Sequence, residues 1–291
     1  MFVTDRAKWY RYHVPSQTLE MFIDAVGMWG ANREVVQMHT AADDRQHVFK
    51  IRTADAAHTT IGIGYYMEPG GPIRFYAAPS ADEAHIDQSG RWTLVLHNDG
   101  NNEIYDNSTG VMVTQVSEGL GALGHTDAGW GYFVGLDNYH PQPGAVILRT
   151  TDPWTNQGLM HHNYDWDLCQ MNHVALPRST NNNHANQIAL GSNIAVNSVY
   201  QNEVTAVRLD GNTQQLVVAP IMTDLNASGG GIDPYAKYPK GNCDVTGDYF
   251  IWTTNLSGNR LDAFVVEVPR QLLLDLTPPV APSDCECKMS G

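Results

Sequence analysis

The chain has 291 residues, which suits one large domain or two smaller ones, and a formal net charge of −14 from 31 acidic and 17 basic residues. Because no basic run offsets this charge, we expect no nucleic-acid partner. No stretch approaches the roughly 18 consecutive apolar residues of a membrane span, so we expect none. With 26 Gly, 15 Pro, 13 Tyr and only 16% charged residues, the composition favours short strands joined by tight turns, an all-β class.

The N-terminal segment from Trp9 to Ile23 has the pattern of two outer strands of a sheet whose inner strands come from elsewhere. We expect it to pair with a C-terminal strand from Ala263 to Val268, because both would otherwise leave open sheet edges. The first residues, MFVTDRAKWYRYHV, lack the basic-then-apolar order of a signal peptide. Because the C-terminal tail resembles the linkers of secreted modular proteins, we expect a secretion signal upstream of Met1.

Three twelve-residue segments align without gaps: AHIDQSGRWTLV from Ala84, GHTDAGWGYFVG from Gly124 and GNCDVTGDYFIW from Gly241. Each has His or Asn, a spacer, Asp, and then an aromatic strand. The aligned positions are His85, His125 and Asn242, then Asp87, Asp127 and Asp244, then Trp92, Tyr132 and Tyr249. We expect the three segments to lie in separate sheets, with the three aromatic residues at equivalent depth.

Looser copies of this unit begin at His39 and His173, and further strand and turn patterns follow every copy. The copies start roughly 40 to 50 residues apart, which is the period of propeller blades, except for a longer last step that contains DLNASGGGIDPYAKYPK. The pattern predicts a β-propeller of four-stranded antiparallel blades over residues 1–275. The chain would hold about six blades, or part of a truncated seven-bladed ring.

Residues 276–291 form a Pro-rich tail, predicted to be a linker to an additional C-terminal domain, as in secreted modular bacterial proteins. This predicts an extracellular or periplasmic location. Four cysteines, two of them in a C-x-C pair in the tail, leave the redox compartment open.

The motif His-x-Asp-x-x-Gly-x-Trp from His85 to Trp92 resembles the strand-opening signature of bacterial TolB-type propellers. Within that group, manganese-dependent oligogalacturonate lyases hold a metal with histidines that project from successive blades, and propeller-fold ulvan lyases use His, Tyr and Arg. The resemblance covers most of the chain as an architecture and implies the fold, without assigning the chemistry.

Equivalent blade positions are related by rotation about the central axis, so residues at the blade starts converge at one end of the channel. His39, His85, His125 and His173 occupy this recurring position and form a candidate site for a divalent metal (Mn, Ca or Zn). His125 and His173, with Arg178 as a clamp for an acidic sugar, are the candidate catalytic residues. Asp224, Asn226, Asp233 and Asp248, near the Gly-rich insertion, offer oxygen ligands for calcium but lack the fixed alternation of an EF-hand loop.

A structural interpretation competes with this site, because a His and an Asp at a blade start can serve as a hydrogen-bonding pair within the blade. For Asp87, Asp127 and Asp244 we expect turn formation, since Asp before Gly commonly bonds its own backbone.

Two functions stay open. One is a propeller module that binds a polysaccharide or a protein partner at the central funnel. The other is a metal-dependent polysaccharide lyase that acts on uronate-containing glycans by β-elimination.

Overall fold

The computed structural model describes most of the chain, namely residues 2–4, 7–117, 122–137, 145–150, 158–161, 173–181, 183, 186–193, 202–210 and 215–274. The expected tail at 276–291 lies outside these residues. None of the helices in the described part is long and apolar enough to cross a membrane.

Four antiparallel sheets have four strands each, in chain order. Their bounds are β4 (Arg33–Thr40), β5 (Gln46–Thr53), β6 (Thr60–Met67), β7 (Ile73–Ala77); β8 (Ala81–Ile86), β9 (Trp92–His97), β10 (Asn102–Asp106), β11 (Val111–Val116); β12 (Thr126–Gly129), β13 (Tyr132–Asp137), β14 (Ala145–Thr150), β15 (Gly158–His161); β16 (His173–Ala175), β17 (Ile188–Ser192), β18 (Glu203–Arg208), β19 (Gln215–Pro220).

Two further sheets have three strands each among the described residues. They consist of β1 (Phe2–Thr4), β2 (Lys8–His13) and β3 (Thr18–Asp24), and of β20 (Asn242–Cys243), β21 (Tyr249–Thr254) and β22 (Asp262–Glu267). Three short helices complete the described elements: α1 (Ala25–Trp29), α2 (Pro234–Lys237) and α3 (Gln271–Leu274). Helix α2 belongs to the Gly-rich insertion that lengthens the last repeat step.

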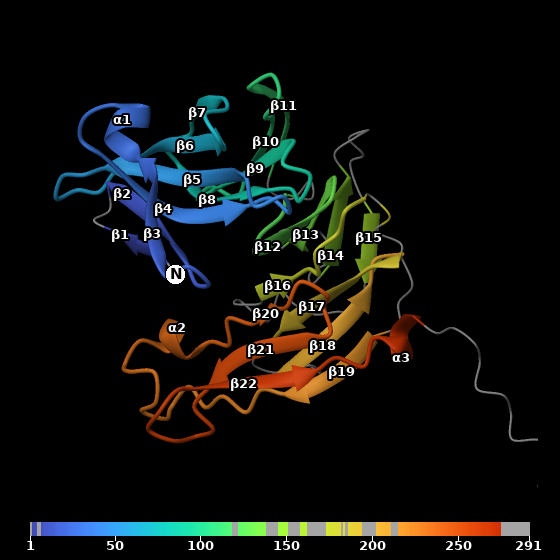
Figure 1. Cartoon of the computed structure of the whole chain (residues 1–291). Coiled ribbons are helices and arrows are strands. Elements are labelled where there is room, and N and C mark those ends of the chain that lie inside the picture. Colours follow the sequence, from blue (N-terminus) through green and yellow to red (C-terminus); the bar gives the residue numbers. More distant parts are fainter. Residues whose placement is uncertain are drawn as a thin grey trace, which may run out of the picture.

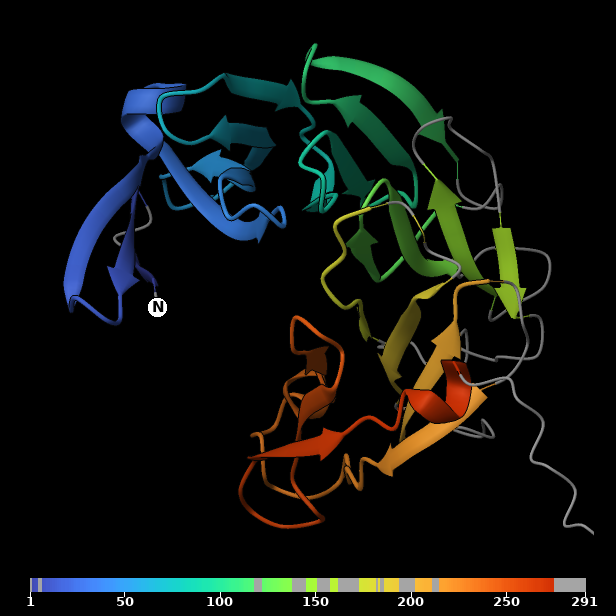
Figure 2. The same ribbon diagram turned by 45° about the vertical axis from the view of Figure 1, so that its right-hand side comes forward.

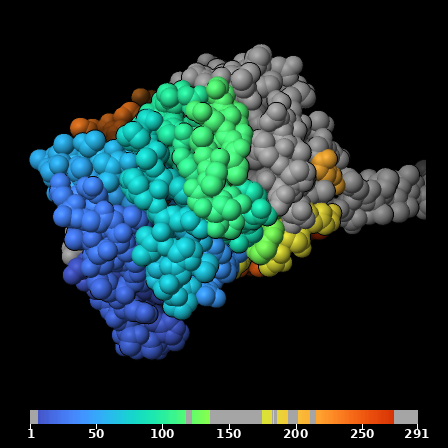
Figure 3. Space-filling model, turned by 90° about the horizontal axis from the view of Figure 1, so that it is seen from above, coloured from blue at the N-terminus to red at the C-terminus, as the bar shows by residue number. Residues whose placement is uncertain are grey.

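The chain is a β-propeller. Figures 1 and 2 show the sheets following one another around a central space, with the first strand of each blade innermost. Neighbouring blades touch through these first strands, β4 with β8, β8 with β12, β12 with β16 and β16 with β20. From above, the N-terminal sheet and the first two blades lie side by side in chain order (Figure 3). Residues at corresponding ends of the first strands therefore share one end of the channel.

The three gap-free repeats are the inner hairpins of three separate blades, each made of a first strand, a turn and the start of a second strand. Trp92, Tyr132 and Tyr249 each begin the second strand, as expected. Their depth is not equivalent, because Trp92 and Tyr132 are buried whereas Tyr249 is 51% exposed. Strand β9 packs against neighbouring blades on both faces, and β13 packs Phe133 against the β8–β11 blade. In contrast, β21 packs one face against the β16–β19 blade and leaves Ile251 exposed on the other.

The expected pairing between the two ends of the chain does not occur among the described residues. Strand β22 pairs with β21, while β2 and β3 pair with each other in a separate sheet. Figure 2 shows the arc of sheets open between these two groups. The N-terminal sheet is held instead by the β4–β7 blade, because Arg11 and the buried His47 both bind the carboxylate of Glu68.

Candidate metal and ligand site at the channel mouth

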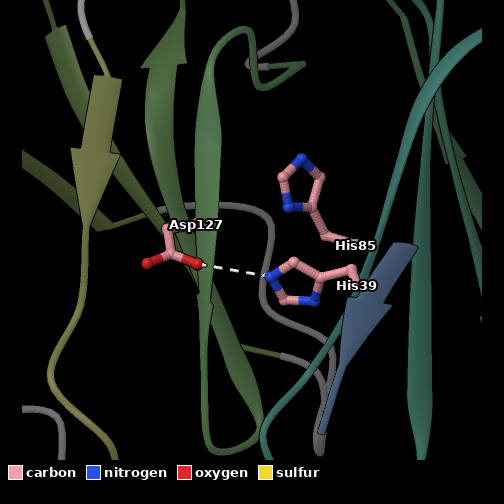
Figure 4. A group of neighbouring side chains, drawn as sticks. All are labelled: His39, His85 and Asp127. Carbon is pink, nitrogen blue, oxygen red and sulfur yellow. Dashed lines mark ion pairs between the residues drawn. The ribbon is translucent and has the colours of Figure 1, made fainter. Parts of the chain in front are cut away.

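Three potential metal ligands meet where three neighbouring first strands face the channel. His39 and His85 are each the next-to-last residue of their strands, β4 and β8, and Asp127 is the second residue of β12. Their ligand atoms all lie within 4.8 Å of one another. The imidazole centroids are 4.9 Å apart, and Nε2 of His39 lies 3.6 Å from Oδ1 of Asp127 (Figure 4). Each side chain is partly buried, so the group is open to a ligand on one side.

His85 has the hydrogen-bonding pattern of a metal ligand. Its Nε2 lies 3.2 Å from Oε2 of Glu83, a carboxylate two residues earlier on the same face of β8. Because a carboxylate only accepts, this contact places the proton of the neutral ring on Nε2. The Nδ1 atom is buried and has no hydrogen-bond partner among the described residues. Nδ1 of His85 therefore has a lone pair available for a metal ion, and Glu83 orients the ring, as in carboxylate–histidine–metal arrangements.

His39 fits a metal only after a rearrangement. Its Nδ1 accepts a hydrogen bond of 3.2 Å from the backbone N–H of Ile86, which leaves the proton of the neutral ring on Nε2, facing Asp127. Coordination through Nε2 would require this proton to move to Nδ1 and the bond from Ile86 to break. That bond is worth about 1 kcal/mol, which is small beside the binding energy of a metal ion.

Asp127 is held in place by two backbone amides. Oδ1 accepts from the N–H of Ala128 at 2.8 Å, and Oδ2 accepts from the N–H of Leu176, in the next blade, at 2.7 Å. The bond from Leu176 joins two blades at the channel, and together the two bonds fix the carboxylate beside His39.

The three aligned aspartates play different roles because their hairpins differ in register. Asp87 and Asp244 begin their turns and accept from the amides of Trp92 and Tyr249, five residues on, at 2.8 and 2.9 Å, so their expected turn role is confirmed. In the second repeat Gly129 pairs directly with Tyr132, which moves the turn to the residues between them. Asp127 therefore lies inside β12, and the expectation of a turn former there is wrong.

A cavity of about 190 Å³, called here the turn mouth, is lined by Thr40, which follows His39 in the chain, and by Leu176, whose amide donates to Asp127, but by none of the three ligand side chains themselves. Its lining comes from blades far apart in the sequence: Thr40, Ala41, Ala42, Asp44, Gln88, Leu176, Arg178, Cys243, Asp244 and Val245. Arg178 is tied to it by its amide, which donates to Val245, and by a long ion pair of 3.6 Å to the exposed Asp44. An exposed pair of this kind is weak, so the guanidinium can exchange Asp44 for a ligand anion.

Not every predicted site residue lies at the turn mouth. His125 precedes β12 and lines a second cavity with Asp82, Glu83 and His97, at the end of the channel where the first strands begin. The structure thus brings His39 and His85 together without His125. His173 is the first residue of the innermost strand β16, and its side chain lies outside the described part of the structure.

The glycine-rich insertion is stabilised by its own side chains. Asp224 accepts from the amide of Asn226, and Asp233 caps α2 through the amide of Tyr235. The buried ammonium group of Lys237 donates to the carbonyls of Leu225 and Ala227.

Two residues of the site, Asp127 and Glu83, were missed as functional from the sequence. The signal for Glu83 was present, since Glu-x-His in a strand places both side chains on one face.

No family model and no curated protein matches the sequence. Among solved structures, an oligogalacturonate lyase in complex with manganese superposes with a TM-score of 0.62 over 94% of this chain and 74% of that one, at 12% identity. This chain shares the fold of that lyase. An oligogalacturonate lyase from Vibrio parahaemolyticus gives the same TM-score at 8% identity, over 93% and 74% of the chains. A chain of a nidogen/laminin complex reaches 0.50 at 12% identity, over 87% and 84%. At these identities the likeness concerns architecture alone, so the site's function rests on its own chemistry.

Proposed function

We propose that this propeller binds an acidic polysaccharide at the turn mouth through a divalent cation held by His85, Asp127 and His39. The observation that carries the proposal is the buried, unpartnered Nδ1 of His85, oriented by Glu83 and converging with Asp127. Three protein donors leave coordination positions open for ligand oxygens.

The charge of the chain explains why a cation is needed. At −14 the protein repels polyuronates, and Arg178 is the only cationic side chain among the described residues that line the turn mouth. A divalent ion would add positive charge where a uronate carboxylate enters, and Arg178 would bind a second oxygen of that carboxylate.

Two imidazoles and one carboxylate suit Mn²⁺ or Zn²⁺ better than Ca²⁺, which prefers oxygen ligands. Manganese is the first choice, since the similar lyase structure is a complex with manganese. An extracellular or periplasmic location belongs to the same proposal, because polymeric uronates occur outside the cytoplasm.

The test is calorimetric titration of a short oligogalacturonate into the protein with Mn²⁺ and with a chelator. We expect saturable binding with Mn²⁺ and at least a tenfold loss on chelation, the size of effect that metal ligands and their hydrogen-bond partners have. Equal binding in both conditions, or none in either, would overturn the proposal. A matched titration with a neutral galactose oligomer should show no metal dependence.

Cleavage by β-elimination stays a prediction. The reaction needs a base beside a substrate whose carboxylate is bound at the turn mouth. Of the predicted catalytic residues, Arg178 lines the turn mouth, whereas His125 lines the cavity at the other end of the channel. The same samples can be monitored for the ultraviolet absorbance of an unsaturated uronate product.

A further inference from the structure

A third and larger cavity, called here the side cavity, lies beside the turn mouth. Its volume is about 550 Å³, and it is formed by the inner turns of three successive blades. The turn after β8 contributes Ser89 and Arg91, the turn after β12 contributes Trp130, and the segment after β16 contributes Thr180 and Asn181.

The walls of the side cavity are fastened to each other across the blades. The buried carboxylate of Asp87 accepts from the amide of Gly131 in the next blade at 2.8 Å. Gln88 donates its amide group to the carbonyls of Ala128 at 2.9 Å and Pro177 at 3.1 Å, and its oxygen accepts from the amide of Ser179. Three turns are thereby held in one arrangement before any ligand arrives, which lowers the entropic cost of binding.

The lining has the chemistry of a site for an acidic sugar. Trp130 is half-buried and supplies an aromatic face for a pyranose ring. The Arg91 guanidinium lies 4.4 Å from the centroid of Trp92 and remains 47% exposed, with a 3.4 Å contact to Asp106. Arg91 lines the side cavity, and guanidinium groups recognise carboxylates through paired N–H donors. Ser89, Thr180 and Asn181 add hydroxyl and amide groups for sugar hydroxyls.

Residues that are close neighbours in the chain line the side cavity and the turn mouth. Gln88 lines the turn mouth and its chain neighbour Ser89 lines the side cavity. The segment after β16 likewise places Arg178 in one and Thr180 in the other. A single extended glycan can therefore reach both.

We propose that the side cavity is a second subsite, which binds an acidic residue of the same polysaccharide chain through Trp130 and Arg91. This rests on the proposed function of the turn mouth. Only an oligosaccharide of several residues can occupy both subsites. The affinity of the protein for oligogalacturonates should therefore rise with the length of the oligosaccharide.

The experiment compares galacturonic acid with a galacturonate hexamer by calorimetry in the presence of Mn²⁺, for the wild type, Trp130→Ala and Arg91→Gln. Arg260→Gln is the matched control, since Arg260 is 79% exposed and its partner Asp262 lies on β22, away from both cavities. We expect each cavity variant to weaken hexamer binding about tenfold, as truncation of a central aromatic or arginine contact does. Monomer and Mn²⁺ affinities should be unchanged, and Arg260→Gln should match the wild type.

Unchanged hexamer affinity in both cavity variants, with Mn²⁺ dependence retained, would overturn the second subsite and leave the proposed function of the turn mouth intact. Equal affinity of the wild type for monomer and hexamer would do the same. Loss of all Mn²⁺-dependent binding in the wild type would instead overturn the proposed function, and the subsite with it. Thermal unfolding of each variant shows whether a loss reflects misfolding, and two chemically different variants keep the test decisive.

Discussion

Replacing Asp87 by Ala should destabilise the propeller far more than the same change at its repeat equivalent, Asp244. The Asp87 carboxylate accepts from the amides of Trp92 and Gly131, both at 2.8 Å, and from the amide and hydroxyl of Ser89. Its loss leaves the buried amide of Trp92 without a partner and breaks a link between blades. At about 1 to 3 kcal/mol for a buried unsatisfied donor, and about 1 kcal/mol for the inter-blade bond, we expect a loss of about 3 kcal/mol.

Asp244 makes the matching bonds, to Tyr249 and Thr246, but these donors lie at the surface and water can replace the carboxylate. Asp244→Ala should therefore cost below about 1 kcal/mol. Urea denaturation followed by tryptophan fluorescence measures both free energies of unfolding. The reasoning is refuted if the two variants lose equal stability, or if Asp244→Ala loses more.

Three further outcomes are expected. Burial lowers the pKa of His47 below its ordinary value of 6.5, so the folded state binds a proton at this imidazole less tightly than the unfolded chain does. The stability of the fold should therefore decrease as the pH drops from about 7 to about 5. His47→Gln should make this pH dependence weaker in thermal melts. Burial raises the pKa of the Cys243 thiol to about 12, so alkylation by iodoacetamide at about pH 8 should be slow at this residue in peptide maps of native protein and fast after denaturation. Lys237→Met should lower the melting temperature, with a loss of about 2 kcal/mol, because two loop carbonyls lose a charged donor; an unchanged melt would contradict the contact.

The repeat made the fold predictable, because the aligned segments carry both the turn and the start of the second strand. The sequence also placed the turn roles of Asp87 and Asp244 correctly. The sequence could not predict which faces of the first and last sheets are buried. Burial of such a face depends on whether another blade packs against it, and the residue pattern of a strand carries no information about that. Hence Tyr249, aligned with the buried Tyr132, is exposed.

The site was predicted in part, and the reason lies in one hairpin. His39 and His85 were placed near each other by rotation of the repeat alone. The same alignment favoured His125, but a shift in strand register brings Asp127 to the channel and leaves His125 at the other cavity. Residue types at aligned positions do not reveal such a shift, because both registers keep the alternation of the strand.

The most direct test of the account is the affinity of Mn²⁺ for the wild type, His85→Ala, Asp127→Asn and His125→Ala, measured by titration with detection of free ion. The wild type should bind one ion per chain. His85→Ala and Asp127→Asn should lose at least tenfold in affinity, while His125→Ala should bind as the wild type does. A wild type that binds no ion, or a loss confined to His125→Ala, would contradict the proposed site.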